Sequence, residues 1–211
     1  MQRVLSGKVR FEGFTDEWET VKLRDICEYF RGLSYNKQNV VDFGLLVLRS
    51  NNIQNYNIDL SDDELQFVNK NCNDDILLKK HDIVICMANG TKKLVGKSAE
   101  YKGNYKGKIT IGAFCGLLRT KNVLLKYILQ TKVYRDYIDI ILAGTNINNL
   151  RSSELLDFTF QIPTSIDEQK KIAELLTLID QDIDNLKQLL HLRKLQKKGL
   201  MQKLLTGEVR V

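Results

Sequence analysis

The sequence is poor in the residues that metal sites, disulfide frameworks and membrane spans need. Its 211 residues include two widely separated histidines and four cysteines, Cys27, Cys72, Cys86 and Cys115, none of which form a Cys-X-X-Cys pair. Reduced thiols packed as small apolar side chains are therefore a better interpretation than zinc ligands or disulfides. No run approaches the roughly 20 apolar residues that cross a bilayer, and the N-terminal segment lacks the apolar centre of a secretory signal. We expect a cytoplasmic protein with no membrane contact.

Motifs for nucleotide binding and catalysis are also missing. The run GTKKLVGKS at 90–98 resembles a phosphate-binding loop, but five residues separate Gly90 from Gly96 where the motif needs four. The sequence after it is unsuited to the helix whose N-terminus would hold the phosphates. Neither an NPPY-like methyltransferase motif nor a glycine-rich cofactor loop occurs. We therefore expect a protein that is not an enzyme and binds no cofactor of its own.

Basic residues are in excess, and they are locally sorted. The formal charge is +6, from 32 Lys and Arg against 26 Asp and Glu. The segment 92–108 carries six lysines with Tyr101 and Tyr105 between them and only Glu100 in opposition. Lysines in such a loop can contact DNA phosphates and release counterions, although a merely solvated lysine loop explains the pattern equally well.

Three polar clusters could read bases, because Arg pairs with guanine edges and Asn or Gln with adenine edges. They are 31–35 (RGLSY), 49–52 (RSNN) and 144–149 (GTNINN). Each has an ordinary alternative explanation, since Asn and Gly also end helices and form turns.

Residues 18–165 resemble a mixed α/β domain with short strands. Ile109, Ile111, Ala113, Cys115 and Leu117 alternate, which predicts one half-buried strand. The apolar spacing within 123–142 predicts a helix. The predicted strands are 45–51, 82–89, 108–118 and 158–163, and the predicted helices are 23–30 and 123–142.

The last predicted element is a long helix over 166–204. Pro163 disfavours helix before it, and Ser165 with Glu168 forms a capping box. At about 1.5 Å per residue, some 38 residues span about 57 Å, which is long for a domain of this size. Its apolar residues step by four and three, the spacing of a coiled-coil seam, although packing on its own domain is the alternative. The seam residues are Ile172, Leu176, Ile179, Ile183, Leu186 and Leu190.

Charge along this helix is segregated. Six acids and two lysines lie within 167–184, whereas 187–203 holds six basic residues and no acid. This order suits the helix dipole. It also suits antiparallel pairing with a second such helix, because each acidic half would face a basic half.

The two ends of the chain repeat each other. MQRVLSGKVRF at 1–11 matches MQKLLTGEVRV at 201–211, with six of eleven positions identical. A unit of about 200 residues far exceeds solenoid periods, so the pattern predicts one unit of a tandem that begins with the tail of a preceding repeat.

These segments together resemble a known family. They are EWETVKLRDICEYFRGLSY, VLRSNNIQN, DIVICMANGTKKLVGKSA, AGTNINNLRSSELLDFTFQIP, DEQKKIAELLTLIDQDI and KKGLMQKLLTGEVRV. The chain is similar to one half of the specificity subunit of type I restriction-modification systems. The family has more prolines before the EQ pair, where only Pro163 remains here. The resemblance implies an α+β fold, a target recognition domain followed by a long helix that forms an antiparallel coiled coil.

The resemblance also implies partners. These are double-stranded DNA with a bipartite target, methyltransferase subunits that supply S-adenosylmethionine chemistry, and a second copy joined through the helix; it leaves a restriction motor subunit open. The implied divisions are 1–11 as a repeat remnant, 12–165 as the recognition domain, 166–204 as the helix and 205–211 as a tail. The expected DNA-binding residues are Arg31, Tyr35, Arg49, Asn51, Asn52, Asn89, Thr91, Lys92, Lys93, Lys97, Lys102, Asn146 and Asn148. A different class of interpretation is a specificity fragment that binds methyltransferase or other specificity subunits without reading DNA. A nuclease or methyltransferase is poorly supported.

Overall fold

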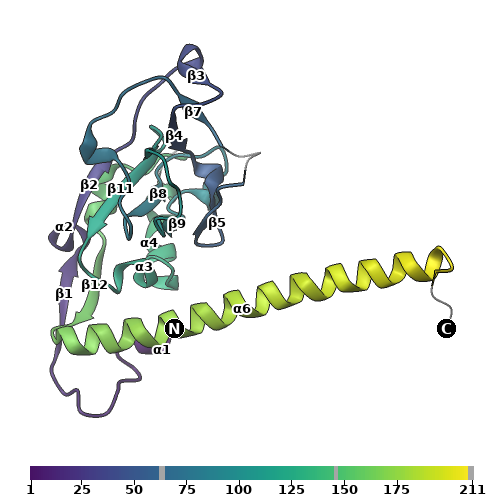
Figure 1. The fold of residues 1–211 in the computed structure, drawn as a ribbon. Coiled ribbons are helices and arrows are strands. Elements are labelled where there is room, and N and C mark those ends of the chain that lie inside the picture. The colour runs from purple at the N-terminus through teal and green to yellow at the C-terminus, as the bar shows by residue number, and fades with distance from the viewer. Residues whose placement is uncertain (62–64, 145–146, 209–211) are drawn as a thin grey trace. The chain divides into compact units, whose positions relative to one another are not determined.

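The computed structural model describes residues 1–61, 65–144 and 147–208 and divides the chain into two compact units (Figure 1). The first unit, Met1–Gln169, holds every strand among the described residues, and the second, Lys170–Val211, contains most of the last helix. The predicted fold class, a mixed α/β domain followed by a long C-terminal helix, is confirmed.

Two four-stranded sheets form the body of the first unit. One sheet is antiparallel, with the order β2-β11-β8-β9, and the other is mixed, with the order β10-β4-β7-β3. In the mixed sheet, β10 runs parallel to β4, with Ile109 opposite Leu46. The strands are β2 Cys27–Arg31, β3 Val40–Val41, β4 Leu45–Leu48, β7 Phe67–Val68, β8 Ile83–Cys86, β9 Ser98–Glu100, β10 Ile109–Ile111 and β11 Cys115–Thr120.

Two smaller strand pairs complete the described sheets. β1 (Trp18–Lys22) pairs antiparallel with β12 (Thr159–Pro163), and this joins the beginning and the end of the domain. β5 (Ile53–Gln54) and β6 (Asn57–Ile58) form a hairpin whose turn residues, Asn55 and Tyr56, both have positive φ. This is the backbone of the two-residue hairpin turns that suit twisted strands.

Short helices connect the strands. α4 begins after Thr131, whose side chain accepts a hydrogen bond from the Tyr134 backbone N–H at 3.3 Å. The ring of Tyr134 meets Phe158 edge to face at 5.2 Å, which holds α4 against the segment leading into β12. The helices of the first unit are α1 Gln2–Leu5, α2 Leu23–Ile26, α3 Leu125–Ile128, α4 Lys132–Ala143 and α5 Ser152–Leu156; the short 3-10 helices are η1 Lys37–Asn39, η2 Ser50–Asn52, η4 Asp74–Ile76 and η5 Lys92–Leu94.

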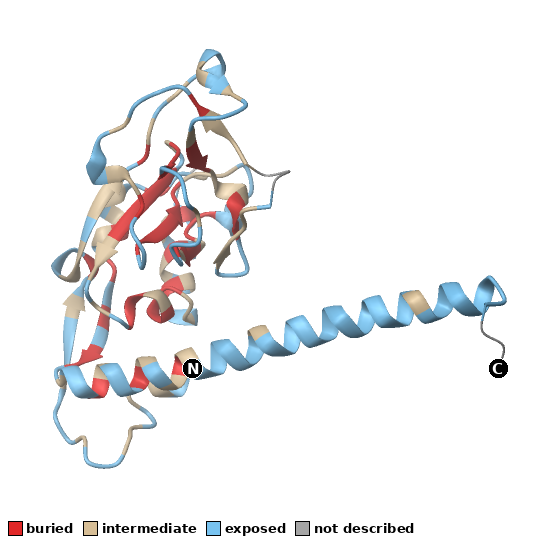
Figure 2. Ribbon diagram, in the orientation of Figure 1, coloured by how far each residue is buried: buried red, intermediate tan, exposed pale blue. Residues whose placement is uncertain are grey.

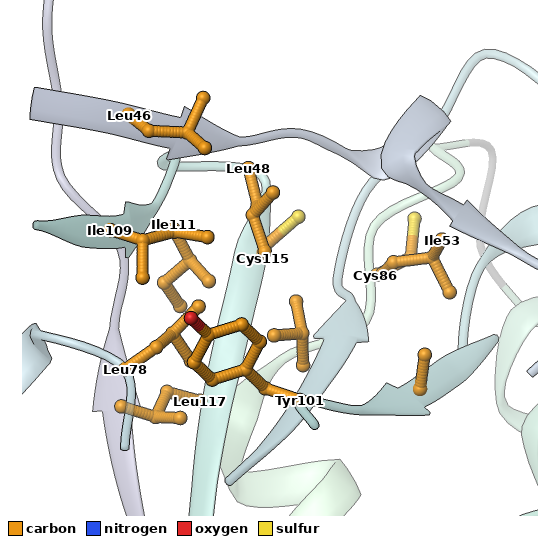
Figure 3. Packing of buried hydrophobic residues seen from close by; sticks show 12 residues of the cluster. Leu46, Leu48, Ile53, Leu78, Cys86, Tyr101, Ile109, Ile111, Cys115 and Leu117 are labelled. Atoms are coloured by element: carbon orange, nitrogen blue, oxygen red, sulfur yellow. The ribbon is translucent and has the colours of Figure 1, made fainter. Parts of the chain in front are cut away.

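The two larger sheets share one apolar core. Leu48 from β4 and Ile111 from β10 lie in one cluster with Cys115 and Leu117 from β11 (Figure 3). These side chains are almost fully buried. Burying one such apolar side chain contributes about 1.5–3 kcal/mol, so this cluster fixes how the strand ends approach one another. Figure 2 shows the same strands as the most buried part of the domain.

Three predicted elements are broken in the structure. The single strand predicted over 108–118 is two strands, β10 and β11, that lie in different sheets and are joined by a turn at 112–114. The helix predicted over 123–142 is interrupted at Thr131, which caps α4 instead of continuing α3. The helix predicted over 23–30 ends at Ile26, and the chain continues as β2 because those residues pair with β11.

The long helix is confirmed, with one change at its start. α6 spans Ile166–Leu205, and the Ser165 hydroxyl accepts from the Glu168 backbone N–H at 3.4 Å. The carboxylate of Glu168 pairs with Arg10 instead of completing the predicted capping box. Most of α6 beyond its first turns is exposed (Figure 2).

The residues expected to form the dimer seam differ in exposure. Ile172 and Leu176 are 1% and 4% exposed, and their place in the seam stays a prediction. Ile179, Ile183, Leu186 and Leu190 are all exposed large apolar residues, and they keep the spacing of a seam.

The buried cysteines will be unreactive while the protein is folded. Burial raises the pKa of the Cys115 thiol to about 12, and burial also raises the pKa of Cys86. Because only the thiolate attacks thiol reagents, both side chains stay protonated and inert at pH 8. Mass spectrometry after alkylation should find Cys86 and Cys115 unmodified in the native protein. Both should be modified in about 8 M urea, which unfolds the chain and exposes the core. Rapid native labelling of Cys115 would contradict this.

Candidate nucleic-acid interface

A hollow of about 590 Å³ gathers residues from four separate segments of the domain. Asparagine side chains and two exposed apolar side chains, Phe114 and Ile147, share its lining. This mixture of amide and apolar groups is the kind that contacts base edges and the thymine methyl group. The lining residues are Ser50, Ala88, Asn89, Gly90, Phe114, Ile147, Asn148 and Asn149.

Backbone pairing holds these segments together. The residues after β8 run beside the segment 147–150, with Ala88 paired to Asn149 and the Leu150 N–H donating to the Met87 carbonyl at 2.8 Å. On the other side, the Met87 N–H donates to the Phe114 carbonyl at 2.8 Å. The residues after β8 therefore hold the hollow together, because the loops on both sides hydrogen-bond to them.

The asparagines of the hollow partly bond to the protein itself. Asn89 donates from Nδ2 to the Ser50 hydroxyl at 3.0 Å, and its Oδ1 accepts from the Thr91 N–H at 2.9 Å. Asn148 donates from Nδ2 to the Gly90 carbonyl at 2.9 Å. These bonds orient the loops, so the side chain of Asn89 has a structural role in the hollow. Of the residues predicted to bind DNA, Asn89 and Asn148 line this hollow, and Ser50 of the cluster 49–52 lies beside them.

Arg49 and Tyr35 form a second polar element at the end of β4. Both side chains are half-buried, and the Nε of Arg49 is buried without a hydrogen-bond partner in the described part of the chain. Burial raises the pKa of the Tyr35 phenol, while the charge of Arg49 acts in the opposite direction. Arg31 is exposed at the end of β2, opposite Gly116, and does not line the hollow.

Asn52 does not have the role predicted for it. The residue is 1% exposed, its Oδ1 accepts from the Arg49 N–H at 2.8 Å, and its Nδ2 donates to the Asp59 carbonyl at 3.1 Å. A buried amide with these bonds cannot reach a base edge, so the prediction of Asn52 as a DNA-binding residue is wrong in this conformation. Asn51, beside it in η2, is half-buried.

Replacing Asn52 with alanine should therefore lower stability and leave base preference unchanged. The change leaves the buried Arg49 N–H and Asp59 carbonyl without this partner, which costs about 1–3 kcal/mol of the free energy of unfolding. Urea denaturation measures the loss, and the exposed Asn104→Ala is the matched control, expected within about 0.5 kcal/mol of the wild type. An altered DNA preference with unchanged stability would restore the base-reading assignment.

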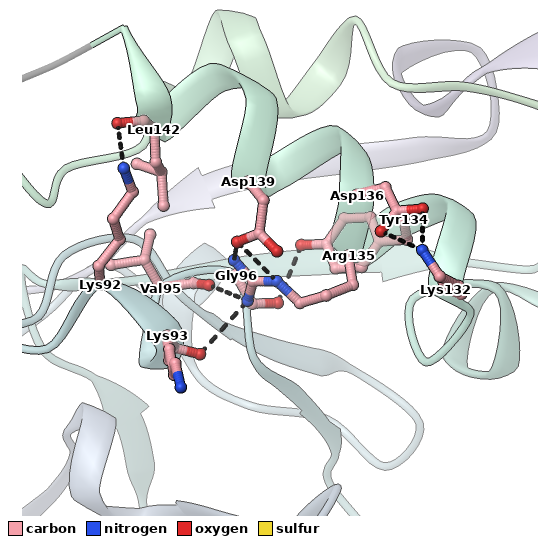
Figure 4. A network of polar contacts seen from close by, with 10 residues as sticks. All are labelled: Lys92, Lys93, Val95, Gly96, Lys132, Tyr134, Arg135, Asp136, Asp139 and Leu142. Atoms are coloured by element: carbon pink, nitrogen blue, oxygen red, sulfur yellow. Dashed lines mark hydrogen bonds and ion pairs between the residues drawn. The ribbon is translucent and has the colours of Figure 1, made fainter.

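The predicted basic loop divides into structural and exposed lysines. Lys92 donates from Nζ to the Leu142 carbonyl at the end of α4 at 2.7 Å (Figure 4). Lys97 donates from Nζ to the Ile53 carbonyl, also at 2.7 Å. Arg135 fixes the same loop by donating to the Val95 carbonyl at 2.8 Å. Lys93 and Lys102 are exposed. Tyr101, interleaved among the lysines in the sequence, lies in the core.

Sequence reasoning missed the apolar part of the hollow. Phe114 is 68% exposed in the turn between β10 and β11, and Ile147 is also exposed. The signal was available, because Phe114 lies between Gly112 and Gly116 within a run that otherwise looks like one strand. Asn146, which was also predicted to bind DNA, lies outside the described residues.

Within residues 1–61, 65–144 and 147–208, no group of three or more His, Cys, Asp and Glu side chains could hold a metal ion. Among these residues, no helix combines the length and the apolar character that a bilayer span requires.

The chain is similar in sequence to known proteins. Residues 15–192 match the family model of the type I restriction modification DNA specificity domain. The chain is 34% identical over 179 residues to the specificity subunit of the type I restriction enzyme StySPI of Salmonella potsdam, and 32% identical over 179 residues to that of EcoKI of Escherichia coli K12. Each alignment covers 81% of this chain and 38% of the relative, so the chain spans well under half the length of these relatives.

Solved structures show the same fold. The type I system S subunit of M. genitalium superposes with a TM-score of 0.65 at 16% identity, covering 93% of this chain and 48% of that one. The HsdS subunit of Thermoanaerobacter tengcongensis superposes with a TM-score of 0.58 at 18% identity, covering 89% and 44%. With the family model matched over most of its length, this chain belongs to the family of type I restriction-modification specificity subunits.

Proposed function

We propose that the chain reads one part of a bipartite double-stranded DNA target and directs methyltransferase subunits to it, without catalysis of its own. The observation that carries the proposal is the convergence of Ser50, Asn89, Asn148 and Phe114 on one hollow, built on backbone-bonded loops. Rigid loops that present amide and apolar groups are suited to direct readout in the major groove.

The exposed lysines supply the second part of DNA binding. Lys93 lies in η5 and Lys102 in the loop after β9, and exposed lysines bind phosphates without reading sequence. Arg49 carries a guanidinium whose buried Nε lacks a partner among the described residues, so it is the candidate for a guanine contact from the edge of the domain. Four further residues stay candidates for contacts with DNA around the hollow: Arg31, Tyr35, Asn51 and Thr91.

Self-association through α6 would give the chain the two recognition domains that a bipartite target requires. The exposed residues Ile179, Ile183, Leu186 and Leu190 are the proposed contacts, and the paired helices are the proposed platform for methyltransferase subunits. S-adenosylmethionine would be bound by those subunits. A restriction subunit would join the same assembly where one exists.

Binding selection from a random double-stranded DNA library tests the proposal. The purified full chain is used alone and together with its methyltransferase subunits. The expected result is an enriched motif with two halves related by a two-fold axis, because two identical recognition domains face the DNA in opposite directions. Absence of enrichment in both experiments would overturn the proposal.

Lys93→Ala is expected to weaken binding equally for specific and nonspecific DNA. Loss of one phosphate contact lowers the slope of log K against log salt by about one. The matched control is Lys132→Ala, because the Lys132 ammonium is already paired with Asp136 and should leave the slope unchanged. Binding isotherms at four or so salt concentrations measure the slope. An unchanged slope in Lys93→Ala would remove this residue from the interface.

A second function is favoured by one observation. Asn52, Asn89, Lys92 and Lys97, all expected to bind DNA, have side chains bonded within the protein. A specificity fragment that binds methyltransferase or other specificity subunits without reading DNA would need no free amides. Co-purification with methyltransferase combined with a failed DNA selection would favour this alternative.

A further inference from the structure

The first eleven residues of the chain occupy a defined site on the first unit. Leu5 is buried, and Gly7 lies against Trp18, where an added Cβ would be 3.5 Å from the indole ring. The Arg10 guanidinium donates to both carboxylate oxygens of Glu168, at 2.8 and 2.7 Å. We call this the end-segment site and define it by Trp18, Phe158, Phe160 and Glu168.

The site is built to hold an arginine and an apolar side chain. The Glu168 residue has no exposed surface, and a buried carboxylate needs a charged partner, which Arg10 provides with two parallel hydrogen bonds. The hydrogen bond to Glu168 raises the pKa of Arg10. Leu5 lines a hollow of about 430 Å³ together with Phe158 and Phe160, so room remains beside the bound segment.

The other end of the chain has a similar sequence and, over residues 201–208, a similar local backbone. Gly7 and Gly207 have φ of +69° and +75°. The N–H groups of Gly7 and Gly207 donate to the carbonyls of Val4 and Leu204 at 3.2 and 3.3 Å. At a third matched position the hydroxyls of residues 6 and 206 donate to the carbonyls of residues 3 and 203, each at 3.3 Å.

The two ends differ in what surrounds them. Leu5 is 9% exposed, whereas its counterpart Leu205 is 83% exposed. The chain thus carries a second segment with the docking sequence, already in the docked backbone conformation, whose apolar side chain faces solvent. Forming the helix end in advance reduces the entropy that binding would cost.

We propose that the end-segment site binds residues 201–211 of a second copy of this chain. Leu205 takes the place of Leu5, Gly207 lies against Trp18, and Arg210 pairs with Glu168. The exchange of one element for an identical one from another copy is the general route of domain swapping. The proposal adds a second contact to the self-association through α6, and it does not depend on DNA reading.

Residues 1–11 compete with residues 201–211 of a second copy for the end-segment site, and the experiment must take this into account. Residues 1–11 are tethered to their own site, and a short tether gives an effective concentration on the millimolar scale. A free C-terminal segment therefore binds the wild-type chain weakly. The docked segment must be loosened before the second segment can be seen to bind.

The test uses a fluorescent peptide of residues 201–211 and two full-length receptor chains. The first receptor carries Leu5→Asp and Leu205→Asp, which loosen its own first segment and silence its own last one. The second carries Arg10→Ala and Leu205→Asp, in case the first is poorly folded. Circular dichroism melting establishes that each receptor is folded, and fluorescence anisotropy measures the binding. Emission of Trp18, the single tryptophan of the chain, reports occupation of the site independently.

The expected result is saturable binding to a folded receptor, at least tenfold tighter than to the wild-type chain. Leu205→Asp in the peptide, or Glu168→Gln in the receptor, should weaken it at least tenfold. Absence of binding to both folded receptors would overturn the proposal, and so would equal binding of the Leu205→Asp peptide. No DNA is present in the assay, so its failure and a failure of DNA selection are separate results.

Discussion

Replacing both Ile179 and Ile183 with aspartate will leave a folded monomer in place of the proposed dimer of the wild-type chain. Both side chains are 43% exposed on α6 and lie four residues apart on one face of the helix. A buried interface would take up these side chains, and aspartate there would bury an unpaired charge. Light scattering measures the result as a fall from about twice 24.4 kDa to the mass of one chain.

The expected effect is large because the change is doubled in a symmetric dimer. Four isoleucines, at about 1.5 kcal/mol each, contribute about 6 kcal/mol, which corresponds to more than four orders of magnitude in Kd. The matched control is Gln181→Asp with Asn185→Asp, which adds the same charges on the opposite face of α6 and should leave the dimer intact. An unchanged dimer in the isoleucine variant would exclude this face as the contact.

The direction of the proposed pairing follows from charge. Asp180 and Asp182 lie in the first part of the exposed seam, between Ile179 and Ile183, and Lys194, Lys197 and Lys198 follow the seam. In an antiparallel pair the acids of one helix face the lysines of the other, whereas a parallel pair would place like charges together. The same pairing brings the C-terminal segment of one copy toward the beginning of α6 in the other, which is where Glu168 lies in the sequence.

The long helix was predictable because its signals are local. Pro163, Ser165 and an uninterrupted helix-forming run determine where α6 begins and continues, and no distant contact is needed. The one local signal that misled was Glu168. Its carboxylate pairs with Arg10, more than 150 residues away in the chain, and a capping-box pattern contains no information about such a partner.

The short strands were less predictable because distant pairing decides them. The run 108–118 alternates like one strand, yet Gly112 lies so close to Gly32 that a Cβ on Gly32 would be 2.1 Å from its carbonyl oxygen. This close approach breaks the run between two sheets. Residues 27–31 have a helix-compatible sequence but become β2 because β11 pairs with them.

The candidate site was predictable in its location more than in its chemistry. Asparagines at 51, 52, 89 and 148 were singled out for their hydrogen-bonding groups, but those groups serve loops as readily as bases. Only the folded structure distinguishes Asn52, which is buried, from Asn148, which lines the hollow. The aromatic contact was missed because a phenylalanine in an apolar run looks like core.

Replacing Phe114 with alanine will lower the affinity for the selected DNA at least tenfold while stability stays near that of the wild type. Phe114 is exposed beside Asn148 and Ile147, and its own carbonyl accepts from the Met87 N–H at 2.8 Å and from the Ala88 N–H at 3.2 Å. These bonds fix the backbone at Phe114, so ordering this residue on binding costs less conformational entropy. A ring carried at this point can contact a thymine methyl group or insert at a base step.

The control separates a specific contact from a general loss of apolar surface. Phe43 is 84% exposed but does not line the hollow, so Phe43→Ala should leave the affinity nearly unchanged. Nonspecific binding and its salt slope should also be unchanged in Phe114→Ala, because the ring contacts no phosphate in the proposed complex. If specific and nonspecific affinity instead fell together, the ring would contribute to the structure of the domain and not to a base contact. The base contacts would then have to come from the amides of Asn148 and Asn149.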